Sequence, residues 1–160
     1  MVFMTDNDRS IIDVLDGRGL LRGQDLEEAL RLLDSKEQSP SQVADKKVNM
    51  IYQLVVKRDR KLDDIRYILE ASKYFEKKGN YLHAAELIGK MGNKDKAREI
   101  YKIGAEYYRE KGMAAEALEA AIGAKLSTSE IRKKYTDKIE NNANLIKMYM
   151  DYADRYPKAS

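Results

Sequence analysis

Apolar and small residues recur at spacings of three and four along most of the chain, which predicts amphipathic helices nearly throughout. The first 38 residues contain two short patterns, one around residues 10–15 and one at 24–34 in which Leu26, Ala29, Leu30 and Leu33 form a single stripe. The segment 35–42 is polar and contains Pro40, so it is predicted to be a linker. The sequence thus begins with a small helical pair.

Beyond the linker, the same periodicity predicts a run of further helices. Ser41 is a plausible N-cap for the first of them. After Ser127, a hydroxyl cap followed by Glu130 predicts one or two additional helices that run to about residue 156. Their apolar side is expected to contain Tyr135, Ile139, Leu145, Ile146, Tyr149, Tyr152 and Tyr156. The helices before Ser127 are expected at 42–58, 62–78, 81–91, 94–111 and 113–124.

The middle of the chain repeats itself after 33 residues, with the same order of side-chain sizes in residues 68–91 and 101–124. A period of this length indicates stacked supersecondary units, each unable to bury its apolar face alone. The glycines predict the turn between the two helices of a unit. We therefore expect an all-α fold of antiparallel helical hairpins. The first copy has Ile68, Ala71, Ser72, Phe75, Gly79, Ala84, Ile88 and Met91, and the second has Tyr101, Gly104, Ala105, Tyr108, Gly112, Ala117, Ala121 and Ala124.

The run AEYYREKGMAAEALEAAIGA at 105–124 resembles the tetratricopeptide repeat, and SKYFEKKGNYLHAAELIGKM at 72–91 resembles a degenerate copy. Two features depart from the family pattern, because the spacing is 33 rather than 34 and no proline ends either unit. The resemblance implies a helical-hairpin solenoid domain over 42–160 with a C-terminal capping region. It leaves open whether the N-terminal pair, residues 1–38, packs on that domain.

The resemblance also implies a concave groove lined by the first helix of each hairpin, which would bind a peptide or helix of another protein. Lys73 and Glu106 stand where some relatives place asparagines that clamp a C-terminal carboxylate, so a chaperone C-terminus is not the first choice of ligand. The chain would then be an adaptor without enzymatic activity, and the lack of cysteine favours a cytoplasmic location. The partner-binding positions are Arg66, Leu69, Lys73, Lys77, Lys102, Glu106 and Arg109, with Glu76 and Glu99 on the same faces.

Charge leaves a second hypothesis open. The net charge is only +3, but residues 1–34 carry eight acids and four arginines, a balance of −4, so the rest carries +7. The basic clusters at 57–61 and 132–134 could contact an anion, and the N-terminal pair with cluster 57–61 could form a nucleic-acid-binding element. However, the second helix begins with Asp25, Glu27 and Glu28, which oppose a phosphate backbone. Nucleic-acid binding is therefore the alternative, not the leading interpretation.

The residue types that most chemistry requires are scarce. There is no cysteine, which excludes disulfides and thiolate metal sites, and His83 is the only histidine. Gly89-Lys90 lacks the other residues of a phosphate-binding loop. No apolar run is long enough for a membrane helix. We expect no cofactor, no metal and no membrane insertion. Two clear repeats are fewer than a stack usually needs, so a homodimer is also possible.

Overall fold

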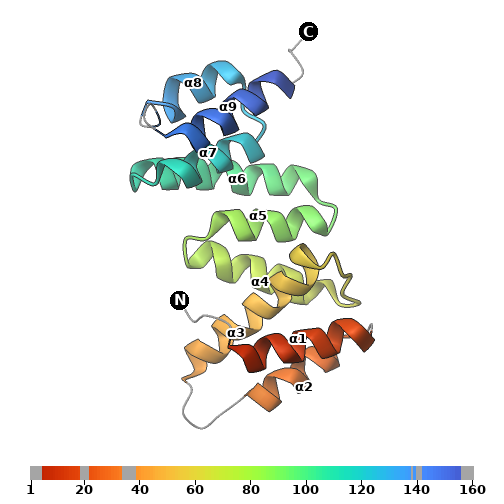
Figure 1. Cartoon of the computed structure of the whole chain (residues 1–160). Helices are drawn as coiled ribbons and strands as arrows, with labels where there is room; N and C mark the ends of the chain where they lie inside the picture. The colour runs from red at the N-terminus through yellow and green to blue at the C-terminus, as the bar shows by residue number, and fades with distance from the viewer. Residues whose placement is uncertain (1–4, 19–21, 34–38, 138, 140–141, 156–160) are drawn as a thin grey trace.

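The computed structural model describes residues 5–18, 22–33, 39–137, 139 and 142–155, and over these residues the protein is all-helical, without a strand. Figure 1 shows helices α3 to α7 following one another along the molecule, with α8 and α9 beyond α7 at one end and α1 and α2 paired at the other. The all-α prediction is confirmed. The elements are α1 (Asp6–Arg18), α2 (Gly23–Leu33), α3 (Pro40–Tyr52), the π-helical segment η1 (Gln53–Lys57), α4 (Ile65–Lys77), α5 (Tyr81–Lys90), α6 (Lys94–Glu110), α7 (Ala114–Gly123), α8 (Thr128–Tyr135) and α9 (Ala143–Arg155).

The four central helices begin and end close to the predicted turns, except that α4 begins at Ile65 rather than at 62, after the N-cap Asp64. Asn80 caps α5 by accepting a hydrogen bond from the backbone N–H of His83 at 3.2 Å, and Asn93 caps α6 in the same way through Lys96 at 3.1 Å. Gly79 and Gly112 end α4 and α6 with φ of 80° and 75°, which glycine adopts without steric cost. The helices α5 and α7 are both ten residues long and start 33 residues apart.

The start of α3 differs from the prediction. The N-cap is Ser39, not Ser41, because Pro40 occupies the first helical position, where its missing N–H costs nothing. Ser39 and Gln42 form a reciprocal capping box at 2.9 and 3.2 Å. The helix expected over 42–58 is α-helical only to Tyr52. It then widens into η1, where the Arg58 N–H donates to the Gln53 carbonyl oxygen at 3.0 Å.

Small residues allow the helices within each repeat unit to approach closely, as the sequence predicts. Ala71, Ala84, Ala105 and Ala117 are all buried. Ser72 is also buried, and its hydroxyl donates to the Ala84 carbonyl oxygen at 3.1 Å, which joins α4 to α5. The neighbouring units use the same principle, because a Cβ atom on Gly104 would lie only 2.5 Å from Cβ of Tyr81.

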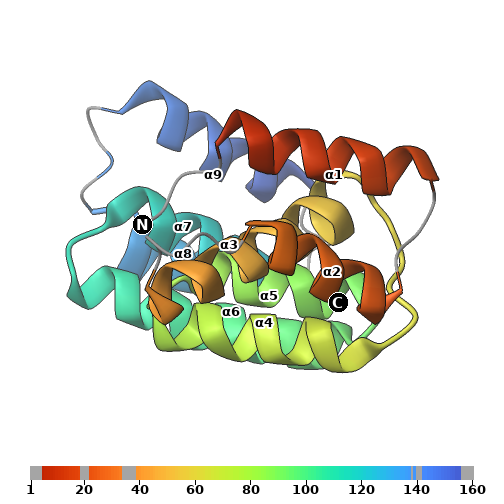
Figure 2. The same cartoon turned by 90° about the horizontal axis from the view of Figure 1, so that it is seen from below.

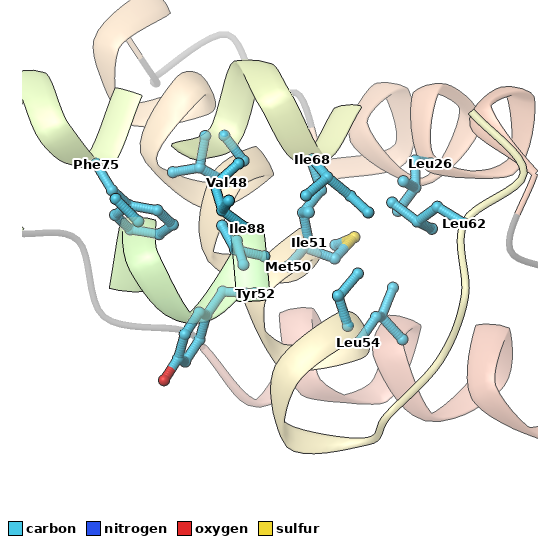
Figure 3. Packing of buried hydrophobic residues seen from close by; sticks show 14 of the residues in the cluster. Leu26, Val48, Met50, Ile51, Tyr52, Leu54, Leu62, Ile68, Phe75 and Ile88 are labelled. Atoms are coloured by element: carbon cyan, nitrogen blue, oxygen red, sulfur yellow. The ribbon is translucent and has the colours of Figure 1, made fainter. Parts of the chain in front are cut away.

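The buried side chains form two clusters along the stack. The first joins α1 to α5 and the beginning of α6, and Figure 3 shows its residues from α2, α3, η1, α4 and α5 in contact. The second joins the rest of α6 to α9. Tyr81 and Tyr101 pack against both clusters, so they connect the two halves of the core.

Helices at alternate positions in the chain also meet, but only on one side of the stack. The helix α5 contacts both η1 and α7, and α7 contacts α9. By contrast, α4 and α6 make at most marginal contact with each other. We call the side of α4 and α6 the first-helix side and that of η1, α5, α7 and α9 the second-helix side. Figure 2 shows α1 and α9 beyond α5 and α7, on the side opposite α4 and α6.

The N-terminal pair contacts the rest of the chain through ion pairs and hydrogen bonds. Arg58 binds the carboxylates of Asp13 and Asp16, and Arg60 also binds Asp16. These contacts attach α1 to the chain directly after η1. The α2 side is joined to α4, since the Tyr67 hydroxyl donates to the Glu27 carboxylate at 2.7 Å.

The C-terminal helices follow the prediction in most respects. Ser127 caps α8 by accepting from the Glu130 N–H at 3.2 Å, as expected. The sequence predicts that Ile146 lies on the apolar side of these helices. It is instead 40% exposed, because it lies on the outer surface of α9. Tyr135, Ile139, Leu145 and Tyr152 are buried as expected, whereas Tyr156 and the side chains of Leu30 and Leu33 lie outside the described residues.

None of the described helices has both the length and the apolarity needed to cross a lipid bilayer.

Candidate functional site

The seven residues predicted to bind a partner all lie on the first-helix side. Arg66, Leu69, Lys73 and Lys77 are on α4, and Lys102, Glu106 and Arg109 are on α6. The lysines are exposed, whereas Leu69 is half-buried against the first cluster. Of the seven, the three lysines therefore lie as cations on the exposed surface of α4 and α6.

Other members of this set are occupied by contacts within the chain. The Arg66 guanidinium binds Asp64, the N-cap residue of its own helix, at 2.8 Å. Glu106 accepts a hydrogen bond from the Tyr135 hydroxyl at 2.7 Å and one from Arg109 at 3.1 Å. The pKa of Glu106 is lowered mainly by the Tyr135 hydrogen bond and then by Arg109. Glu106 and Tyr135 thus hold α8 against α6.

Small hollows lie at the two ends of this face. Arg66 lines one of about 310 Å³ together with Glu27 and Lys47, and Arg109 lines another of about 140 Å³ together with Lys134 and Tyr135. The first-helix side is also the more widely spaced side of the stack. This spacing does not favour a hollow along α4 and α6, and the groove there stays a prediction.

A larger pocket, of about 890 Å³, lies between α6, α7 and α9. We call it the basic pocket, because four of its lining residues are cationic and one is acidic. Its volume falls within the range of about 300–1,000 Å³ that is usual for ligand sites. The lining residues are Arg98, Ile122, Lys125, Asn144, Lys147, Met148, Asp151, Tyr152 and Arg155.

The floor of the basic pocket is ordered by the contact between α7 and α9. Tyr152 is buried, and its hydroxyl donates to the Leu126 carbonyl oxygen at 2.7 Å, which fixes α9 against the end of α7. Ile122 and Met148 pack beside it in the second cluster. The pocket therefore combines an apolar floor with a cationic rim, an arrangement that suits an anionic ligand with an apolar part.

Sequence reasoning missed this pocket because its residues come from three helices up to 57 positions apart. Arg98 and Lys147 look like ordinary solvated charges when each helix is considered alone. One signal was present in the sequence. Lys125 occupies the position equivalent to Gly92 in the preceding copy of the repeat, so a charged side chain replaces a turn glycine there.

A group of polar and aromatic side chains, Tyr52, His83 and Glu86, lies where α3, α5 and η1 meet. The Tyr52 hydroxyl donates to Glu86 at 2.7 Å, and Figure 3 shows it pointing away from the buried side chains. Burial and this hydrogen bond raise the pKa of Tyr52. His83 stacks on the Tyr52 ring, with 3.8 Å between ring centroids, and its Nδ1 lies 3.0 Å from the side-chain nitrogen of Asn80. This cluster joins helices, and it gives the only histidine a packing role.

The burial of His83 makes stability depend on pH. Burial lowers its pKa below the ordinary value of 6.5, with Glu86 opposing this shift and Lys57 adding to it. A lowered histidine pKa favours the neutral form in the folded state, so stability is lost as the pH falls below about 6.5. We expect His83→Phe, which keeps a ring on Tyr52, to reduce this loss. Urea unfolding between pH 7.5 and 5 checks it, and parallel curves for variant and wild type would contradict it.

Two of the four cations in the basic cluster 57–61 are already bound by carboxylates within the chain. Arg58 and Arg60 are bound by the α1 carboxylates, and Asp59 within the cluster binds Lys90 at 2.9 Å. Phosphate binding depends on cations that can replace released counterions. The cluster acts instead as the attachment point of the N-terminal pair, which weakens the alternative hypothesis.

Among the described residues, no group of three or more histidine, cysteine or acidic side chains is placed to hold a metal ion. The chain matches no protein-family model, and no curated protein or solved structure is significantly similar to it.

Proposed function

We propose that the protein is a non-enzymatic interaction module, a short solenoid of helical hairpins that binds a peptide or helix of a partner protein. The observation that carries this proposal is the open pocket of about 890 Å³ between α6, α7 and α9, with its apolar floor and charged rim. Buried apolar anchors surrounded by a charged rim are typical of protein recognition surfaces.

The arrangement of the helices supports the same function. In stacked repeats each unit packs only on its neighbours, so two long sides remain available to other molecules. The contacts of α5 with η1 and α7, and of α7 with α9, shorten the second-helix side. A stack that is shorter on one side curves toward that side. We therefore place the partner on the second-helix side, in continuity with the basic pocket.

Site-specific photo-crosslinking tests this function. A photoreactive amino acid is introduced at Glu119 or Lys147 on the second-helix side, at Lys73 or Lys102 on the first-helix side, and at Lys61 as a control, all of them exposed. In extract from the source cells, we expect discrete adducts of one partner from Glu119 and Lys147 only. Adducts from Lys73 and Lys102 instead would favour the first-helix groove. The absence of a discrete adduct at all four positions would contradict the proposed function.

A double charge reversal tests, independently of crosslinking, which side of the stack binds the partner. Lys73→Glu combined with Lys102→Glu changes the first-helix side by four charges without touching the basic pocket. We expect partner capture to be unchanged in this variant. Loss of capture would show that the groove predicted from the sequence is the binding surface.

Self-association remains a further prediction. Ile146 and Met150 are exposed on the outer surface of α9, at the end of the stack, where a second copy could cover them. Sedimentation velocity at two protein concentrations tests this, and a single concentration-independent monomer would exclude it.

A further inference from the structure

We propose that the basic pocket binds an acidic segment of the partner protein and that Lys125 is a binding residue at its rim. This inference rests on the proposed function and names the chemistry of the partner.

The first observation is the charge of the rim. Arg98, Lys125, Lys147 and Arg155 face a single acid, Asp151, around one pocket. Four cations close together repel one another, and a ligand that carries several negative charges relieves this repulsion. The charge of the pocket is therefore complementary to a segment rich in aspartate or glutamate.

The second observation is that part of this charge is not used within the chain. Among the described residues, neither Arg98 nor Lys147 forms an ion pair within 4.0 Å, and both are exposed. Arg155 donates from Nε to the Asp151 carbonyl oxygen at 3.2 Å, a contact to backbone, and it forms no ion pair with another described residue. By contrast, Arg58, Arg60 and Arg109 elsewhere in the stack are each paired with a carboxylate.

The third observation is the backbone at Lys125. The helices α4, α5 and α6 are each followed by a glycine with positive φ, namely Gly79, Gly92 and Gly112. After α7 the same position is Lys125, with φ of 58°. The turn itself is unchanged, since Leu126 N–H donates to the Ala121 carbonyl oxygen at 3.3 Å as Asn93 N–H does to that of Ile88 at 3.2 Å.

A lysine in this conformation is unfavourable compared with glycine, because its Cβ crowds the backbone. The three preceding helix ends show that the fold accepts glycine there. Unfavourable backbone conformations concentrate at functional sites, where another requirement outweighs the local cost. The side chain of Lys125 lines the basic pocket, so a charge at the rim is the requirement that the geometry points to.

The floor of the pocket distinguishes a peptide from a simple anion or a nucleic acid. Ile122, Met148 and Tyr152 present apolar surface between the cations. Inorganic phosphate leaves such a floor uncovered. Single-stranded nucleic acid prefers exposed aromatic faces on which bases stack, whereas Tyr152 is buried and hydrogen-bonded to Leu126. An acidic segment with interspersed leucine-like side chains matches both the rim and the floor.

Fluorescence anisotropy with a defined probe tests the proposal. The probe is a short fluorescein-labelled peptide in which glutamate alternates with leucine, and its control has glutamine in place of every glutamate. We expect the acidic peptide to bind, with an affinity that falls as salt is raised, and the glutamine peptide to bind at least about tenfold more weakly. Equal binding of the two peptides, or no binding of either, would overturn the proposal.

Variants locate the binding. Lys147→Glu with Arg155→Glu should weaken binding of the acidic peptide at least about tenfold. Lys61→Glu with Lys133→Glu makes the same charge change outside the pocket and should have an effect of less than about threefold. Equal losses in the two double variants would show a response to net charge alone and would reject the pocket. Binding of polyuridylate RNA to the pocket, without binding of the peptide, would also reject the proposed acidic ligand.

Lys125→Gly provides a readout that a purely structural role would not give. The variant should bind the acidic peptide several-fold more weakly, while its melting temperature stays the same or rises. Unchanged affinity would remove Lys125 from the site. If partner adducts form in extract but the acidic peptide does not bind the pure protein, the proposed function stands and this inference fails. If the peptide binds but no partner is captured in extract, this inference stands and the proposed function fails.

Discussion

Leu118→Ala is expected to lower the free energy of unfolding by about 3 kcal/mol, within the range of about 2–5 kcal/mol seen for fully buried leucines. Leu118 is 0% exposed and lies on α7, inside the second cluster that joins α6 to α9. Its replacement removes apolar contacts and leaves a cavity that the tightly packed helices cannot close. The loss is measured by urea unfolding followed by circular dichroism.

A matched control for this variant is Ile103→Ala on the neighbouring helix α6. Ile103 is 55% exposed, so its truncation should change stability by no more than about 0.5 kcal/mol. A small effect of Leu118→Ala, comparable with that of the control, would mean that α7 is not packed within the second cluster as described.

Asp8→Ala is expected to cost about 3 kcal/mol, because it leaves the ammonium group of Lys46 buried without its partner. Asp8 is 1% exposed and Lys46 is 8% exposed, and Asp8 Oδ2 lies 3.8 Å from Lys46 Nζ. The same carboxylate accepts a hydrogen bond from the Thr5 N–H at 2.9 Å, so the substitution also removes one half of the capping box at the start of α1, while the bond from the Asp8 N–H to Thr5 Oγ1 remains.

Two further variants show whether the expected loss comes from the buried charge. Asp6→Ala changes an exposed acid in the same turn of α1 and should have little effect. Asp8→Ala combined with Lys46→Met removes both charges, and we expect it to recover most of the lost stability. If Asp8→Ala alone has no measurable effect on denaturant unfolding, α1 is not docked on α3 in solution.

The sequence predicted the central helices well because local signals mark their ends. The glycine–asparagine steps at 79–80 and 92–93, and Gly112, are turn signals that do not depend on distant contacts, and α5, α6, the end of α4 and the start of α7 lie close to them. The small residues of the repeat likewise identified the buried helix contacts, since alanine at 71, 84, 105 and 117 is buried.

The remaining differences arise where tertiary contacts decide. Nothing local to residues 53–57 predicts a π-helical segment, and the exposure of Ile146 depends on how α9 lies on α7. The basic pocket was missed for the same reason, because Arg98 and Lys147 come together only when α6 and α9 are placed in space. Comparing the two repeat copies residue by residue would have identified Lys125, since it breaks a pattern of glycines.

The segment η1 has a consequence for how this architecture can change during evolution. A π-helical turn contains one residue more than the α-helical turn it replaces. Loss of a single codon within 53–57 would restore regular α-helical winding and leave the following residues near their present orientation, because the wide turn already absorbs the extra residue. Arg58 and Arg60 would then still face Asp13 and Asp16, which they bind now. The segment η1 is therefore a place where one residue can be gained or lost without detaching the N-terminal pair.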